Sequence, residues 1–348
     1  MKRVHTISFT GISAPGGVPR FNRYLHKILS EEGFDVQHWC WDDVKSLSAS
    51  VNAMLYDEYS IALETGSILA RMNLVKKDDI IIGDGFWCHA FTMLGFKNVI
   101  SVAHGIWGHV TKTDIDKGVK IENHALDCMQ RDHRLTHNKR KLPIVAVSQF
   151  IHDEMNKQNG IESIVINNAI DESEIKKVDE DAVSTFEFYV LHGINDILNK
   201  NKGWDHISCL MQSKSNIASS IMSLDKLFQI YKHRGCETKM EAMQLASVAI
   251  APSGFEGNSY FMLELLMCGV PVICYDVGLP YEIKQKGLEE KVGIILDRNE
   301  RSPELTVDAF DRFFDSKDLS KIDTRSVANE LASFDKFKDS WISLVKSL

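Results

Sequence analysis

Two glutamates in the last third of the chain have a spacing that suits the binding of hydroxyl groups. Glu256 and Glu264 lie in the stretch APSGFEGNSYFMLELLMCGVPVICYDVG, residues 251–278. The short apolar runs at either end predict buried parallel strands, and YFMLELLMC predicts the helix between them. Ligands of parallel sheets bind at the carboxyl ends of the strands. We therefore expect a binding site with Glu256 before the helix and Glu264 about one turn inside it.

The start of the predicted helix adds an anion site. Backbone N–H groups of Asn258, Ser259 and Tyr260 face outward there, and the helix dipole favours negative charge. A diphosphate suits this position. A carboxylate at the depth of Glu264 suits the two hydroxyls of a ribose. Glu256 is placed to bind the group attached to the far side of the diphosphate. The spacing alone leaves a second interpretation open, in which both glutamates are solvated surface residues.

The elements around this stretch predict an α/β protein of two domains. Strand-like runs alternate with helical patterns throughout the 348 residues, which favours parallel sheets covered by helices. The length suits two cores of about 170 residues each. We predict one domain over 1–170, a second over 171–333, and an amphipathic helix over 334–348 that packs back on the first. Within the second domain, KLFQIYKHRG (226–235) is predicted to be a strand followed by a turn.

The composition excludes several classes of protein. A net charge of −8 gives no general attraction to nucleic acid or to anionic membranes. The seven cysteines contain no C-x-x-C pair, so we expect reduced buried thiols and neither a disulfide framework nor a zinc site. We expect no metal site, no signal peptide and no membrane-spanning helix, hence a cytoplasmic protein whose membrane contact, if any, is peripheral.

Residues 252–278 also resemble the E-x7-E signature of GT-B glycosyltransferases of family 4, or group 1. Ser259 stands where the family usually has glycine, and Leu265 where it usually has alanine. The resemblance implies two facing Rossmann-like domains, an acceptor domain followed by a shortened nucleotide-sugar donor domain, and transfer with retention of configuration. The matching positions are Pro252, Ser253, Glu256, Gly257, Glu264, Gly269, Pro271 and Val272.

Two further segments of the first domain are similar to that family. GISAPGGVPRF resembles its N-terminal glycine loop, in which Gly16 and Gly17 allow the backbone to approach a ligand closely. VAHGIWGH resembles its histidine loop, which makes His104 the residue that reaches the transferred sugar, with His109 a weaker second candidate. As a plain turn and a structural histidine, both segments would also be unremarkable.

The leaving diphosphate requires cations, because charge builds on its oxygen in the transition state. VLHGINDILNKNKGWDHI resembles the family's G-R-L-x-x-x-K-G segment and implies this role for Lys202. The usual arginine is missing, Asn195 or Asp196 stands near its place, and Lys200 is the candidate substitute. In the predicted strand 226–235, Arg234 is the candidate neighbour of the nucleobase.

The resemblance implies a glycosyltransferase that uses a nucleotide-diphosphate sugar as co-substrate, with no metal or other cofactor. The acceptor is expected to be a glycan, a lipid-linked or a small-molecule hydroxyl. Basic patches of the first domain (Arg20, Arg23 and Lys27, and residues 130–141) leave peripheral membrane contact, or action on modified nucleic-acid bases, open as alternatives. A catalytically degenerate binding module and a nucleotide-sugar epimerase are two further alternatives.

Overall fold

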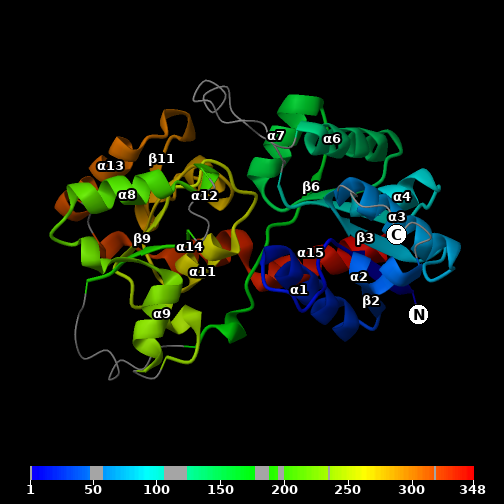
Figure 1. The fold of residues 1–348 in the computed structure, drawn as a ribbon, viewed down its shortest axis with the longest axis horizontal. Coiled ribbons are helices and arrows are strands. Elements are labelled where there is room, and N and C mark those ends of the chain that lie inside the picture. The colour runs from blue at the N-terminus through cyan, green and yellow to red at the C-terminus, as the bar shows by residue number, and fades with distance from the viewer. Residues whose placement is uncertain are drawn as a thin grey trace. The chain divides into compact units, whose positions relative to one another are not determined.

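A computed structural model describes residues 2–47, 58–105, 124–176, 188–194, 200–233, 236–316 and 319–348 (Figure 1). The chain divides into two compact units. Unit 1 comprises Met1–Asn168 together with Asp335–Leu348, and unit 2 comprises Ala169–Phe334. Among the described residues, no helix combines the length and the apolar character that a membrane span requires.

Unit 1 is built on a parallel sheet of six strands in the order β2-β1-β3-β4-β5-β6. The central strands β3 and β4 are buried along their whole length, as expected where helices cover both faces of a sheet. The strands are β1 (Arg3–Ile7), β2 (Asp35–Trp39), β3 (Ile80–Asp84), β4 (Val99–Ala103), β5 (Ile144–Ala146) and β6 (Ile164–Val165). The helices are α1 (Gly17–Glu31), α2 (Trp41–Val44), α3 (Glu58–Arg71), α4 (His89–Met93), α6 (His124–Lys139) and α7 (Gln149–Asn159), with 3-10 turns η1 (Lys45–Leu47) and η2 (Gly85–Cys88).

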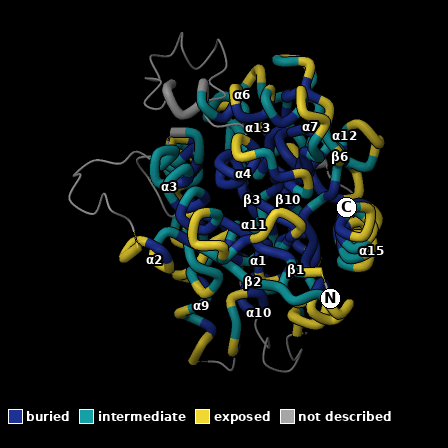
Figure 2. Tube along the Cα trace, turned by 90° about the vertical axis from the view of Figure 1, so that its right-hand side faces the viewer, coloured by how far each residue is buried: buried dark blue, intermediate teal, exposed yellow. Residues whose placement is uncertain are grey.

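Local sequence signals fix two of these helices. The apolar residues of α1 recur at helical spacing, and Phe21, Leu25 and Ile28 are fully buried. Helix α7 begins where Ser148 accepts a hydrogen bond from the backbone N–H of Ile151 (3.3 Å), and ends at Gly160 in the left-handed conformation. Figure 2 shows that the strands are buried, whereas the helices bury one side and expose the other.

The last helix of the chain, α15 (Phe334–Lys346), belongs to the core of unit 1. Its Phe337 and Trp341 pack edge-on against Phe21 of α1, with ring centroids 5.9 and 5.6 Å apart. Trp341 is fully buried. Unit 1 is therefore assembled from both ends of the chain.

Unit 2 has a parallel sheet of five strands in the order β11-β10-β9-β7-β8. Alternate residues of each strand face opposite cores. In β9 (Val248–Ala251), Val248 and Ile250 pack with α8 (Trp204–Ser213) and α13 (Pro303–Ser316). Ala249 packs with the helices on the other face, which are α9 (Leu224–Lys232), α10 (Lys239–Met243), α11 (Tyr260–Met267) and α14 (Thr324–Ala332). The strands are β7 (Val190–His192), β8 (Ile221–Ser223), β9 (Val248–Ala251), β10 (Val272–Tyr275) and β11 (Gly293–Leu296).

The helices of unit 2 include one that corrects a prediction. Residues 226–235 were expected to form a strand, but α9 (Leu224–Lys232) is helical and the strand is the preceding β8. The helical period holds because Leu227 and Tyr231, four positions apart, are buried. The remaining elements are η3 (Glu172–Glu174), η5 (Lys200–Lys202), α8 (Trp204–Ser213), η6 (Ala218–Ser220), α10 (Lys239–Met243), α11 (Tyr260–Met267), α12 (Leu279–Gln285), η7 (Glu289–Lys291), η8 (Arg298–Glu300), α13 (Pro303–Ser316), η9 (Leu319–Lys321) and α14 (Thr324–Ala332).

Candidate functional site

A pocket lies in unit 2 at the carboxyl ends of β7, β9 and β10, where parallel sheets bind ligands. Lys202 and Glu256 are the two charged residues among the described ones that line it. Ser253 and Ser259 add hydroxyl groups, and Phe261 supplies an aromatic wall. The pocket thus joins an apolar lining to a few polar groups, as small-molecule sites do.

Two backbone segments are joined at the mouth of this pocket. The backbone N–H of Gly254 donates to the carbonyl of Asn201 (2.9 Å), and the Asn201 side-chain amide donates to the carbonyl of Phe255 (2.9 Å). These hydrogen bonds hold η5 beside the loop that precedes α11. As a result Lys202 Nζ forms an ion pair with Glu256 Oε1. The side chains are 38% and 22% exposed, so both charges remain open to a ligand.

Glycines allow this close approach. Gly203 has φ +75°, and a Cβ there would lie 2.9 Å from the carbonyl oxygen of Pro252. At Gly193, a Cβ would lie 2.5 Å from the ring of Phe261. A side chain at either position would therefore separate the segments that line the pocket.

Helix α11 points its N-terminus at the pocket. Ser259 is the N-cap residue with φ −66° and ψ 124°, an ordinary conformation for any residue, so the serine in place of the family's glycine causes no backbone strain. Its backbone and that of Tyr260 lie at the helix start, where an anion site remains a prediction. Asn258 is buried directly before the cap. Glu264 is half-buried one turn into the helix, and it lies outside the lining of this pocket.

Three of the predicted site residues of unit 2, Lys202, Glu256 and Ser259, thus meet in one pocket. Lys200 begins η5 two positions before Lys202, and its side chain lies outside the described part of the chain. Arg234, together with Asn195 and Asp196, also lies outside the described residues.

Two ionisable side chains in or next to the pocket lining are uncharged at neutral pH. Burial lowers the pKa of His192, at the end of β7, to about 4, so this imidazole is uncharged at neutral pH. Burial also raises the pKa of Tyr275, whose hydroxyl donates to the carbonyl of Ser302 (3.0 Å). The charge at this site consequently rests with Lys202 and Glu256.

In unit 1 the predicted histidine has a carboxylate partner. His104 follows β4, and its Nε2 lies 2.8 Å from Oδ1 of Asp84 at the end of β3. Asp84 also accepts a hydrogen bond from the side chain of Asn22 (3.0 Å), and the imidazole packs edge-on against Phe21 (4.7 Å between centroids). This arrangement fixes the orientation of the imidazole. His109 lies outside the described residues.

Gly16 and Gly17 stand at the start of α1. Gly16 has φ +124°, which favours glycine, and Gly17 is the first residue of the helix. Sequence reasoning did not identify Asp84, Asn201 or Phe261. The signal for Asp84 was present, since it ends a strand beside the strand that carries His104.

One segment of the chain is similar to a known protein family. A sequence model described as "Glycosyl transferases group 1" matches residues 222–326, the segment that contains Glu256 and Glu264. No match was found among curated proteins.

Solved structures match over the whole chain. Sucrose-phosphate synthase from Thermosynechococcus elongatus has a TM-score of 0.72 at 12% identity, covering 100% of this chain and 99% of that one. Anabaena HepE in complex with UDP-glucose has a TM-score of 0.66 at 14% identity and 100% coverage of both chains. WaaG, a glycosyltransferase involved in lipopolysaccharide biosynthesis, has a TM-score of 0.65 at 12% identity, covering 98% of this chain and 99% of that one. The two parallel sheets thus have the GT-B fold, and residues 222–326 of unit 2 are similar to the group 1 glycosyl transferases.

Proposed function

We propose that this protein transfers a sugar from a nucleotide diphosphate to an acceptor hydroxyl. The observation that carries the proposal is the Lys202–Glu256 pair beside the N-terminus of α11, inside a pocket at the carboxyl ends of the strands. A cation and the N-terminus of a helix suit a diphosphate, and a carboxylate beside them suits the hydroxyls of a sugar.

These groups have distinct tasks in the reaction. The bond between the anomeric carbon and the diphosphate oxygen breaks, a bond to the acceptor oxygen forms, and the proton of the acceptor hydroxyl passes to the leaving diphosphate. Lys202 and the start of α11 stabilise the charge that develops on the leaving diphosphate. Glu256 orients the sugar, and the family resemblance gives His104 a role on the same sugar. The E-x7-E signature supports retention of configuration.

UDP is the first nucleotide to test, because one structure of Anabaena HepE holds UDP and another holds UDP-glucose. The basic residues of α1, together with the exposed Arg131, Lys139, Arg140 and Lys141, support the further proposal that the acceptor or its carrier is anionic. Glu264 is proposed to bind the ribose hydroxyls, in keeping with its place in the matched segment.

The ion pair suggests an experiment with opposite outcomes for its two members. UDP, GDP and ADP are titrated calorimetrically into wild type, Lys202→Ala and Glu256→Gln. Loss of a charged contact to phosphate should weaken UDP binding of Lys202→Ala by roughly 10- to 100-fold. Glu256→Gln releases Lys202 from its partner, so its UDP affinity should be equal to or higher than that of wild type. Its sugar transfer should nevertheless fall by about 100-fold or more.

Lys214→Ala provides the matched control, because Lys214 pairs with Asp311 in the same unit but away from the pocket lining. Its nucleotide affinity should equal that of wild type. If none of the three nucleotides binds to wild type, the proposed activity is wrong and a degenerate binding module is the better interpretation.

A further inference from the structure

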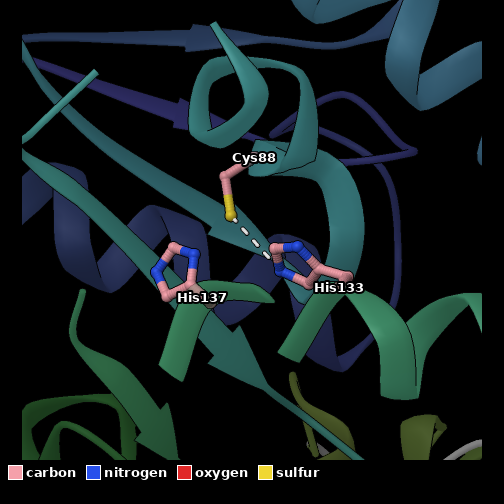
Figure 3. A group of neighbouring side chains, drawn as sticks. All are labelled: Cys88, His133 and His137. Atoms are coloured by element: carbon pink, nitrogen blue, oxygen red, sulfur yellow. Dashed lines mark hydrogen bonds between the residues drawn. The ribbon is translucent and has the colours of Figure 1, made fainter. Parts of the chain in front are cut away.

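Three potential metal ligands meet in the core of unit 1, away from the pocket. Cys88 ends η2, and His133 and His137 lie four positions apart on α6. Spacing of four places both imidazoles on one face of the helix. The sulfur and one nitrogen from each ring all lie within 4.8 Å of one another, and Figure 3 shows the three side chains converging. All three are fully buried.

Hydrogen bonds determine which nitrogen His137 offers. Its Nε2 lies 3.2 Å from the carbonyl oxygen of Val99 and 3.1 Å from that of Pro143. Carbonyl oxygens only accept, so Nε2 carries the proton and Nδ1 keeps its lone pair. Metal-binding histidines use the same arrangement, in which the other ring N–H donates to a backbone carbonyl.

The remaining two ligand atoms face each other. His133 Nε2 lies 3.7 Å from Cys88 Sγ and 3.0 Å from the Ser101 hydroxyl. That hydroxyl donates to the carbonyl of Gly85 (2.9 Å), so without metal the Nε2–H of His133 donates to the Ser101 oxygen. A metal bound at Nε2 therefore requires this proton to move to Nδ1, which has no hydrogen-bond partner within the described part of the chain.

We propose that Cys88, His133 and His137 bind one thiophilic cation with a filled d shell, Cu(I) or Zn(II). Thiolate sulfur and imidazole are the ligands that these ions prefer. Ligand atoms around one such ion lie about 3.5 Å apart, so the side chains close inward by roughly 1 Å. The ion displaces the thiol proton. With one thiolate and two neutral imidazoles, Cu(I) gives a complex without net charge, which suits a buried site.

The bound ion would act as a structural cross-link. It would tie Cys88, four residues after Asp84, to α6 in the same unit. The proposal is independent of nucleotide binding in unit 2, and its test uses no transferase activity.

Metal uptake of the full-length chain tests the site directly. The protein is unfolded under anaerobic reducing conditions, refolded with one equivalent of Cu(I) or Zn(II), and freed of loose metal by gel filtration. Wild type should retain about one equivalent of one of these ions and melt about 5 °C or more above the metal-free protein. The two arms identify which ion is held.

Variants then assign the ligands. Cys88→Ser and His137→Asn should each weaken binding by more than about 100-fold, because even residues that only orient a ligand cost 10- to 100-fold. Cys274→Ser is the matched control, since Cys274 is equally buried but lies in unit 2, and it should bind as wild type does. Retention of neither ion by wild type, or full retention by Cys88→Ser, overturns the proposal.

A spectrum of the wild type covers the case in which Cys88→Ser does not refold. Co²⁺ is refolded into the wild type in place of Zn(II). A sulfur-to-cobalt charge-transfer band supports a thiolate ligand, and bound Co²⁺ without this band excludes Cys88.

Discussion

At the scale of single residues, both candidate centres depend on a charged group that orients another. Glu256 faces Lys202 in unit 2, and Asp84 faces His104 in unit 1. Asp84 is buried and accepts from two side chains, which makes it a positioning residue rather than a solvated carboxylate. Such groups act through the residue that they hold.

Replacing Asp84 by asparagine tests this role. The variant should lower kcat by up to about 100-fold, because a displaced imidazole loses its alignment with the sugar. UDP affinity should not change, since the proposed nucleotide pocket lies in unit 2. Stability should fall by about 1–3 kcal/mol from the altered buried hydrogen bonds. Steady-state kinetics, calorimetry and thermal unfolding separate the three effects.

Asp79→Asn is the control for that experiment. Asp79 Oδ2 lies 3.0 Å from Nε2 of the buried His5 in the same unit, where no site residue is involved. It should cost comparable stability and leave kcat unchanged. An equal loss of kcat in both variants would show that general destabilisation, not the orientation of His104, limits activity.

At the scale of elements, the junction of η5 with the loop before α11 positions the ion pair. Asn201 bridges the two segments through its backbone and its side chain. Since η5 is a single 3-10 turn and the loop before α11 has no helix or strand, this bridge helps to hold Lys202 against Glu256. The geometry of the pocket mouth therefore depends on a residue that does not itself line the pocket.

Asn201→Ala removes the side-chain half of the bridge. The loss of one neutral hydrogen bond should cost about 1 kcal/mol of stability. If UDP binding loses the same free energy because Lys202 is displaced, UDP affinity should fall roughly 5-fold. The control is Asn299→Ala, whose side chain contacts only the exposed carboxylate of Asp297 among the described hydrogen bonds, and unchanged affinity in both variants would contradict the role of the bridge.

At the scale of the whole molecule, unit 1 carries half-buried neutral histidines that make it sensitive to acid. Burial, with the neighbouring His38 as a second cause, lowers the pKa of His26 to about 4, and burial also lowers the pKa of His38. Both rings contact the hydroxyl of Thr6, at 3.3 and 2.9 Å. The folded chain thus binds fewer protons than the unfolded chain between pH 6.5 and 4.

Stability from these groups should be fully present above pH 6.5 and lost as the pH falls toward 4. For His26 the loss amounts to about 2–3 kcal/mol. Chemical unfolding at several pH values should show this slope in wild type and a smaller one in His26→Gln. The exposed His233→Gln in unit 2 should retain the wild-type slope, and an unchanged slope in His26→Gln would contradict the assignment.

The sequence by itself predicted the fold class, the resemblance of residues 252–278 to group 1 glycosyltransferases, and an anion site at the start of α11. Parallel strands are short apolar runs, and helix boundaries such as Ser148 and Gly160 are local signals, so both can be read along the chain. The interval between Glu256 and Glu264 is likewise local. The error at α9 arose where a short amphipathic run fitted two periods and its length did not discriminate between them.

Only the tertiary structure decided which distant residues meet. Asp84 reaches His104 because β3 and β4 are neighbours in the sheet, and Asn201 reaches Phe255 across 54 positions. Cys88 meets His133 and His137 across 45 positions or more, so a sequence without a C-x-x-C pair still assembles a potential metal site. Such contacts are set by strand order and helix packing, which depend on the whole core and leave no signal in local spacing.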